Sequence, residues 1–207
     1  KTKNDWGVIE IDERSSMHIY PYIKPGYVVC TNLFRDSLCR NAHPEYIADI
    51  ISEYMQPETK LVLNADDMIS SGVAAGNPRV YYSIKRLETD TEECQNIIND
   101  CQICPKCGTK LEYEYVRYHQ IGKAHCPSCG FSSAKPDYEA EVHFDENYLL
   151  LDEKGNVQKY DLISDSIFNI YNQITVTTLL REMGLTPDEV RDGFGKIHVV
   201  DTRYRKV

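Results

Sequence analysis

The sequence contains no apolar run long enough to cross a membrane. A membrane-spanning helix needs about 20 consecutive apolar residues, whereas the longest apolar stretches here, such as 148–151, have the length of a strand. No secretory leader is visible. We therefore expect a cytoplasmic protein with no transmembrane segment. Because the first residue is Lys and not Met, we also expect the 207 residues to be a piece of a longer chain.

The sequence also lacks an excess of positive charge. Its 23 Lys and Arg residues face 32 Asp and Glu residues, so the formal net charge is −9. A negative domain repels the phosphate backbone of DNA and RNA. This balance disfavours general nucleic-acid binding and leaves room for a local phosphate site.

A phosphate-binding loop of the form G-x-x-x-x-G-K-[ST] is missing as well. The nearest match is Gly-Phe-Gly-Lys at 193–196, but Ile197 follows the lysine and the spacing is wrong. Such a loop holds the phosphates of a nucleotide with its backbone N–H groups. Alone, the chain is therefore not expected to bind or hydrolyse ATP well.

Cysteine is present in a pattern typical of a metal site. Five of the eight cysteines fall between Cys101 and Cys129, and four of these form two Cys-Pro-x-Cys-Gly pairs. In each pair the proline stiffens the turn, and the glycine allows a left-handed backbone whose N–H groups point at the thiolates. Four thiolates form a closed site, which is structural and not catalytic. The sequence therefore predicts a structural zinc site with these ligands: Cys104, Cys107, Cys126 and Cys129.

Several alternatives to this site stay open. A redox pair uses a single C-x-x-C, and an iron–sulfur cluster also uses four cysteines, but the doubled knuckle favours zinc over both. Cys101 could replace Cys104, and His119 or His125 could substitute for a cysteine. A zinc ribbon can also bind nucleic acid, but basic and acidic residues are mixed in this block and form no basic stripe.

Short apolar segments alternate with helical patterns in the first half of the chain. Four segments rich in β-branched and aromatic residues are expected to be buried strands: 6–12, 27–32, 60–66 and 79–84. Between the second and third, apolar residues recur at helical spacing from Ile47 to Tyr54. Strand, helix and strand at this length predict an α/β fold with a mostly parallel sheet flanked by helices. A second helical stripe is expected from Cys94 to Cys101, with both cysteines packing in the core.

The second half predicts a hairpin-like stretch and two helices. Residues 110–118 alternate as in a hairpin, and three later segments are expected to form antiparallel strands at the edge of the main sheet: 139–143, 147–151 and 157–160. A long helix from Ile167, capped by Ser164 or Asp165, should end at Gly184. A short helix should follow, opened by a capping box of Thr186 and Glu189.

Polar residues follow the first three predicted strands. They are 10–13 (EIDE), 31–32 (TN) with 35–36 (RD), and 64–67 (NADD). Ligands bind beyond the carboxyl ends of parallel strands, and carboxylates and amides suit Mg²⁺ and nucleotide phosphates. Strands also end in polar residues simply because loops are wet, so each cluster alone favours neither reading.

Five segments, taken in chain order, carry a resemblance to a known family. They are 10–13 (EIDE), 31–36 (TNLFRD), 63–67 (LNADD), the cysteine block closing in 126–131 (CPSCGF) and 136–138 (PDY), and 169–172 (NIYN). In this order they resemble the central, P-loop-NTPase-like domain of Mur ligases, here without its P-loop. The particular likeness is to the MurT-type subunit of lipid II isoglutaminyl synthase. It covers nearly the whole chain, and the zinc-ribbon insert is its specific part because ordinary Mur ligases lack one.

The resemblance implies an ATP-dependent amide ligase of peptidoglycan synthesis. Such a subunit activates the α-carboxyl of the D-glutamate in lipid II as an acyl phosphate, and a glutamine amidotransferase partner of the GatD type delivers ammonia. By position, Glu10 resembles the family's Mg²⁺ ligand, and Asn32 resembles a residue near the nucleotide phosphates. Asn169 and Asn172 resemble the asparagines of the H-N-x-x-N motif, with Asn172 facing the adenine.

Departures from the family pattern put the activity of this piece in doubt. Phe168 replaces the motif's His, Ser37 stands where ordinary Mur ligases have a Mg²⁺-binding His, and Cys39 replaces an Asp. The phosphate loop and the third domain of the family are missing, and 194–196 (FGK) resembles the Gly-Arg hinge into that domain. We expect the parent protein to be an enzyme and this piece alone to be inactive.

The resulting domain prediction has three parts. Residues 1–100 and 138–195 form the Mur ligase central domain, 101–137 form the zinc-ribbon insert, and 196–207 form a linker towards a further domain. Two other functions stay open. One is a non-enzymatic zinc-ribbon module that binds protein or nucleic acid, and the other is a different Mur-family amino-acid ligase.

Overall fold

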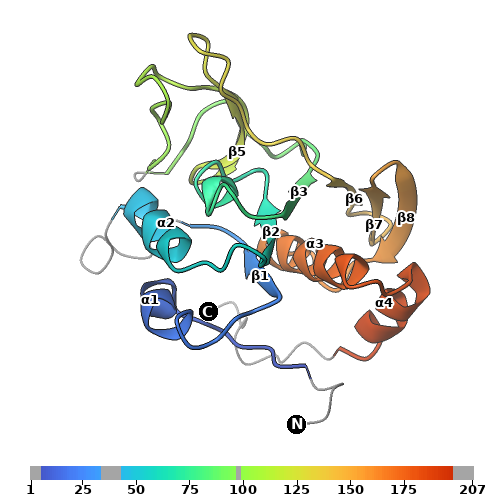
Figure 1. Ribbon diagram of the computed structural model, residues 1–207. Helices are drawn as coiled ribbons and strands as arrows, with labels where there is room; N and C mark the ends of the chain where they lie inside the picture. The colour runs from blue at the N-terminus through green and yellow to red at the C-terminus, as the bar shows by residue number, and fades with distance from the viewer. Residues whose placement is uncertain (1–5, 34–42, 97–98, 198–207) are drawn as a thin grey trace, which may run out of the picture.

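A computed structural model describes residues 6–33, 43–96 and 99–197 (Figure 1). Its centre is a six-stranded sheet in the order β1-β2-β3-β6-β7-β8. The strands are β1 (Tyr27–Cys30), β2 (Lys60–Asn64), β3 (Arg79–Ile84), β6 (Tyr138–His143), β7 (Tyr148–Glu153) and β8 (Asn156–Asp161). The first four strands in this order pair in parallel, and β7 and β8 pair antiparallel. The structure thus confirms the mostly parallel sheet and the antiparallel strands at its edge.

Helices cover both faces of this sheet. Alternate residues of a strand point to opposite faces, so a strand with consecutive apolar residues needs a core on each side. Leu61 and Leu63 of β2 pack in one core with residues of α2 and with Tyr20, the C-cap of α1, whereas Val62 packs in a second core with residues of α3 and α4. Figure 1 shows the two helix pairs on opposite sides of β1 and β2. The helices are α1 (Ser16–Ile19), α2 (Pro44–Glu53), α3 (Ile167–Glu182) and α4 (Pro187–Phe194), with short 3-10 turns at Glu13–Ser15 and Ser70–Gly72.

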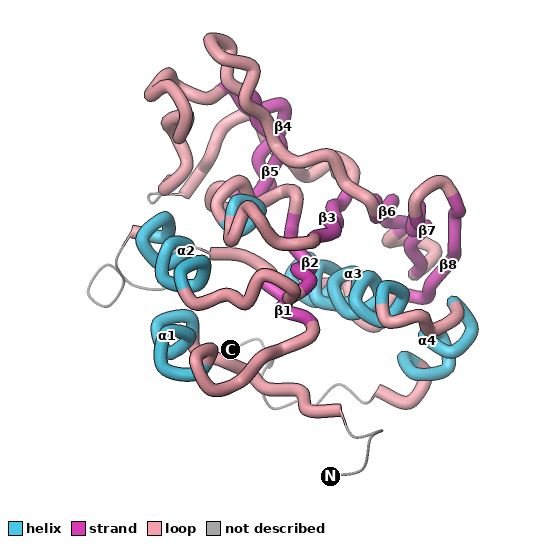
Figure 2. The backbone as a smooth tube through the Cα atoms, in the orientation of Figure 1, coloured by secondary structure: helices cyan, strands magenta, loops and turns pink. Residues whose placement is uncertain are grey.

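A separate antiparallel hairpin stands between β3 and β6 in the chain. It consists of β4 (Glu112–Tyr118) and β5 (Ile121–His125). Because β3 and β6 are parallel neighbours in the main sheet, the hairpin and the cysteine block lie within a crossover connection. Figure 2 shows this segment as a long excursion beyond the end of β3.

The ends of the two long helices follow the sequence signals closely. Gly184 has a φ of 95° just after α3, and Thr186 and Glu189 form the expected capping box at α4. The cap of α3 differs by one residue: its N-cap is Ser166, whose N–H donates to the Ser164 hydroxyl at 3.2 Å. None of the helices in the described ranges is long and apolar enough to cross a membrane.

Two sequence predictions are wrong in the described residues. No strand forms at 6–12, where Trp6 and Val8 are 74% and 99% exposed. Apolar β-branched residues favour a strand only where a neighbouring strand offers a hydrogen-bond ladder, and this segment pairs with none of the described strands. Similarly, 94–96 and 99–101 form no helix. Cys101 is buried as expected, whereas Cys94 is only half-buried. Residues 97–98 of that stripe lie outside the described ranges.

Candidate metal centre and sheet edge

Two knuckles with the same backbone geometry hold the four cysteines. Gly108 and Gly130 have φ values of 74° and 71°, which is the left-handed conformation that the sequence predicts for them. In each knuckle the glycine N–H donates to the carbonyl of the first cysteine, Cys104 at 2.9 Å and Cys126 at 3.1 Å. These tight turns bring both thiols of each pair to the same side of the backbone.

The four thiols meet at one point. The Sγ atoms of Cys104 and Cys129 are 3.6 Å apart, those of Cys107 and Cys126 are 3.4 Å apart, and all four lie within 4.8 Å of one another. A tetrahedral zinc site with metal–sulfur bonds of about 2.3 Å separates its sulfurs by about 3.8 Å. The donor set therefore fits a structural metal. The other candidate ligands, Cys101, His119 and His125, are not part of this group.

The thiols also differ in how readily they ionise. Hydrogen bonds with the hydroxyl and backbone of Thr109 lower the pKa of Cys107 to about 6. The backbone N–H of Phe131 lowers the pKa of Cys129, but desolvation and the neighbouring cysteines raise it to about 12. One thiolate therefore forms easily and then opposes ionisation of its neighbours. A bound divalent cation would remove that opposition, because a coordinating thiol is deprotonated.

Residues 31–32 after β1 and 64–67 after β2 meet at the carboxyl edge of the sheet, as expected for parallel strands, whereas 35–36 lie outside the described residues. The Asn64 amide donates to the carbonyl oxygen of Thr31 at 3.1 Å. The Leu33 N–H donates to the Asp67 carboxylate at 2.7 Å. Hydrogen bonds therefore join the segment that follows β1 directly to the segment that follows β2.

The two aspartates of this edge are occupied by protein groups. Asp66 and Asp67 are buried. The Asp67 carboxylate accepts from the N–H groups of Leu33 and Ile69, and the Asp66 carboxylate accepts from the Ile84 N–H at 3.0 Å. Burial raises the pKa of both aspartates, and the hydrogen bonds, which lower it, offset only part of this effect. Both side chains therefore join the polypeptide segments around this edge through backbone N–H groups.

Comparison with known proteins decides the relationship of this chain. It is 36% identical over 194 residues to the MurT subunit of a lipid II isoglutaminyl synthase (glutamine-hydrolyzing) from Staphylococcus aureus, which covers 93% of this chain and 43% of that protein. It is 27% identical over 206 residues to the corresponding subunit from Streptococcus pneumoniae, which covers 97% and 45%. No protein-family profile matches the chain.

The chain is a homologue of MurT. It spans less than half the length of the curated relatives it matches. Among solved structures it is similar to a pseudomurein peptide ligase type C from Methanothermus fervidus, with a TM-score of 0.67, 28% identity and coverage of 86% of this chain and 35% of that one. MurF from Acinetobacter baumannii shares the fold alone, with a TM-score of 0.52, 9% identity and coverage of 89% and 32%.

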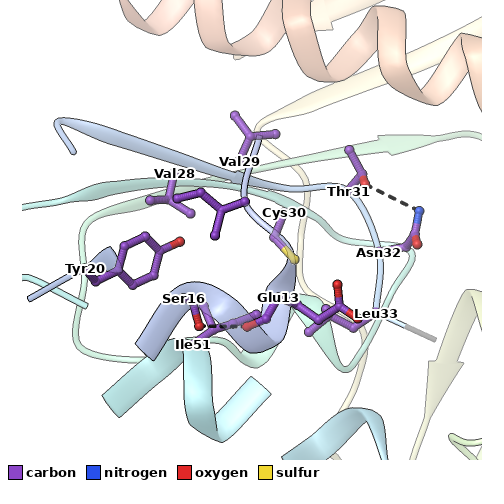
Figure 3. A pocket seen from close by; sticks show the side chains of 11 residues that line it. Glu13, Ser16, Tyr20, Val28, Val29, Cys30, Thr31, Asn32, Leu33 and Ile51 are labelled. Atoms are coloured by element: carbon purple, nitrogen blue, oxygen red, sulfur yellow. Dashed lines mark hydrogen bonds between the residues drawn. The ribbon is translucent and has the colours of Figure 1, made fainter. Parts of the chain in front are cut away.

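In this MurT homologue, a cavity of about 210 Å³ lies beside the edge. Figure 3 shows Glu13 and Cys30 directed into it, with Asn32 at one end after β1. The Asn32 amide lies 3.5 Å from the Thr31 hydroxyl. Burial raises the pKa of the Cys30 thiol, which therefore stays neutral. Glu10 does not line this cavity and is exposed on the extended segment before it.

The two asparagines of α3 lie near its first turn in the MurT homologue. Asn169 is half-buried and donates to the Ser164 hydroxyl at 3.1 Å, whereas Asn172 is exposed. Phe168, which replaces the motif's His, is 51% exposed. The positions of Ser37 and Cys39 lie outside the described residues.

Sequence reasoning missed one cluster in this MurT homologue. In the sequence, Arg117 of β4 is one of the mixed charged residues of the cysteine block, yet its side chain is 3% exposed and contacts Asp66 and Asp90. The signal was available, since Arg117 continues an alternating series with Leu111, Tyr113 and Tyr115, and alternate positions of a strand share a face.

Proposed function

We propose that the chain is the central part of an ATP-dependent amide ligase that amidates the D-glutamate α-carboxyl of lipid II to isoglutamine. The main support for this proposal is the 36% identity to the Staphylococcus aureus MurT subunit over 93% of the chain. The thiol cluster in the crossover between β3 and β6 supports it, because the resemblance rests most specifically on that insert. The whole protein's activity would be cytoplasmic, where ATP is available.

The proposed reaction has two steps. A carboxylate oxygen of D-glutamate attacks the γ-phosphorus of ATP, so that ADP leaves and an acyl phosphate forms. Ammonia then attacks the acyl carbon, and phosphate leaves as the amide forms. Ammonia would come from a glutamine amidotransferase partner. The protein's part in such a transfer is chiefly to position the substrates and to stabilise charge.

Two kinds of metal have separate roles in this proposal. Cys104, Cys107, Cys126 and Cys129 would hold zinc, which fixes the fold of an insert with little core of its own. Glu10 would bind Mg²⁺, Asn32 would lie near the phosphates, and Asn169 and Asn172 would lie near the adenine. The predicted parts, 1–100 with 138–195, 101–137 and 196–207, remain our domain proposal.

The described surface of the hairpin supports the ligase over a nucleic-acid-binding zinc ribbon. Lys123 lies 3.1 Å from Glu114, and His125 lies 3.4 Å from Glu112. In both pairs an acidic side chain of β4 lies beside a basic side chain of β5. A phosphate backbone would meet acidic groups at each basic one.

The test uses the full-length protein with its amidotransferase partner. Lipid II, glutamine and Mg-ATP are incubated with both subunits, and the product is identified by mass spectrometry. We expect isoglutamine-containing lipid II, formed only with ATP, and ammonium salts should replace glutamine and the partner. Unchanged lipid II in both the glutamine and the ammonium reactions would overturn the proposal.

A further inference from the structure

The Arg117 side chain lies buried between the cysteine-bearing hairpin and the main sheet. Its guanidinium donates to the Asp90 carboxylate at 3.0 and 2.8 Å. It also donates to the carbonyl oxygens of Ile84 at 3.3 Å and Lys85 at 3.0 Å, where β3 ends. Arg117 therefore joins β4 of the hairpin to the carboxyl edge of the sheet.

The same guanidinium reaches α3 through Tyr171. It lies 3.4 Å from the Asp66 carboxylate and donates to the Tyr171 hydroxyl. That hydroxyl donates in turn to Asp66 at 2.6 Å. Tyr171 is buried and stands between Asn169 and Asn172 in the sequence of α3. One buried cluster thus connects the hairpin, the end of β2 and the helix that carries both asparagines.

The charges of this cluster require the arginine. The buried carboxylates of Asp66 and Asp90 face a single guanidinium. Tyr115 of the hairpin adds a hydroxyl 3.3 Å from Asp66. A buried carboxylate without its cation is strongly unfavourable, and a lysine cannot reproduce the planar fork of donors that reaches several acceptors at once. The position of Tyr171 therefore depends on a side chain supplied by the insert.

The other end of α3 has anchors of its own. Arg181 pairs with Glu153 at 2.7 Å, and Glu182 pairs with Lys60 and Lys154. These contacts hold the helix to the strands without touching the hairpin. Loss of an arginine at this end therefore tests the general effect of weakening α3.

We propose that Arg117 is a positioning residue of the nucleotide site, which holds Tyr171 and thereby fixes the face of α3 that carries Asn169 and Asn172. This proposal rests on the proposed function, in which those asparagines lie near the adenine. It gives the cysteine-bearing hairpin a role in ATP affinity, in addition to any role in folding. A rigid packed element that two sites share can carry such coupling.

The experiment compares Arg117→Lys with Arg181→Lys in the full-length protein and its partner. The dissociation constant of Mg-ATP is measured by calorimetry, together with the KM values for ATP and glutamine. We expect Arg117→Lys to weaken ATP binding by about 2- to 30-fold and to raise the KM for ATP without raising that for glutamine. Arg181→Lys should lower the melting temperature with ATP binding unchanged.

Tyr171→Phe keeps the test decisive if Arg117→Lys fails to fold. The phenyl ring preserves packing and removes only the hydroxyl, so the same selective loss of ATP affinity is expected. Equal ATP affinities in Tyr171→Phe, Arg181→Lys and the unmodified protein would overturn the role of Arg117. Absence of Mg-ATP binding by the unmodified protein would instead overturn the proposed function, and this inference with it.

Discussion

Glu182, at the end of α3, is the centre of an ion-pair cluster that makes stability depend on pH. Its carboxylate lies 2.5 Å from the ammonium groups of both Lys60 and Lys154, and the Tyr138 hydroxyl donates to it at 2.5 Å. Burial raises the pKa of Glu182, but hydrogen bonds from these three residues lower it to about 2, from an ordinary value of 4.5.

The difference between 4.5 and about 2 corresponds to about 3 kcal/mol of stabilisation, at about 1.4 kcal/mol per pH unit. Lys60 and Lys154 are 32% and 49% exposed, so solvent screens the pairs, and we expect about 1–2 kcal/mol. Because the folded pKa is depressed, this stabilisation is fully present above about pH 4.5 and is lost as the pH falls towards 2.

Urea unfolding of Glu182→Gln and the unmodified protein measures this contribution. The free energies of unfolding should differ by about 1–2 kcal/mol at pH 7, and the difference should shrink as the pH falls below about 4.5. Glu141→Gln is the control, because the Glu141–Lys85 pair is nearly half exposed on both sides and should contribute at most about 0.5 kcal/mol. A difference that stays constant down to pH 2.5, or an equal effect of both variants, would refute this reasoning.

Two further predictions concern the cysteine block. Cys126→Ser should reduce the metal content from about one zinc per chain to near zero and lower the melting temperature, whereas Cys94→Ser, outside the cluster, should change neither. Elemental analysis and calorimetry measure both effects, and iron in place of zinc would contradict the site. Gly122→Ala would bring its Cβ within 2.1 Å of a carbonyl oxygen of the facing strand, so it should destabilise the protein by about 1–3 kcal/mol in urea unfolding. Gly76→Ala, with nothing within 4 Å, is the matched control.

The parts of the fold that the sequence predicted are those set by local pattern. The strands at β2 and β3 and the capping box at Thr186 lie where the local pattern indicated them. The convergence of the four thiols was also predictable, because two Cys-Pro-x-Cys-Gly knuckles fix their own turns. The geometry that brings the two knuckles together is set by the rest of the insert, and the local pattern does not specify it.

What the sequence did not predict depends on contacts between residues that lie far apart in the chain. Residues 6–12 have the composition of a buried strand, but a strand forms only with a partner, and local sequence does not specify one. The local sequence also did not show that Asp66 and Asp67 accept hydrogen bonds from the backbone of Ile84 and Leu33. Arg117 finds its carboxylate partners 27 and 51 positions away in the chain, a separation that no local window detects.

We propose above that the full-length protein activates a lipid II carboxylate with ATP. The most direct test of this proposal is oxygen transfer in the full-length protein with its partner. Lipid II carrying ¹⁸O in the D-glutamate α-carboxyl is amidated, and the released phosphate is analysed by mass spectrometry. An acyl phosphate passes one carboxylate oxygen to the phosphate, so we predict ¹⁸O-labelled phosphate in equal amount to the amide. Amide formation with unlabelled phosphate would contradict the account.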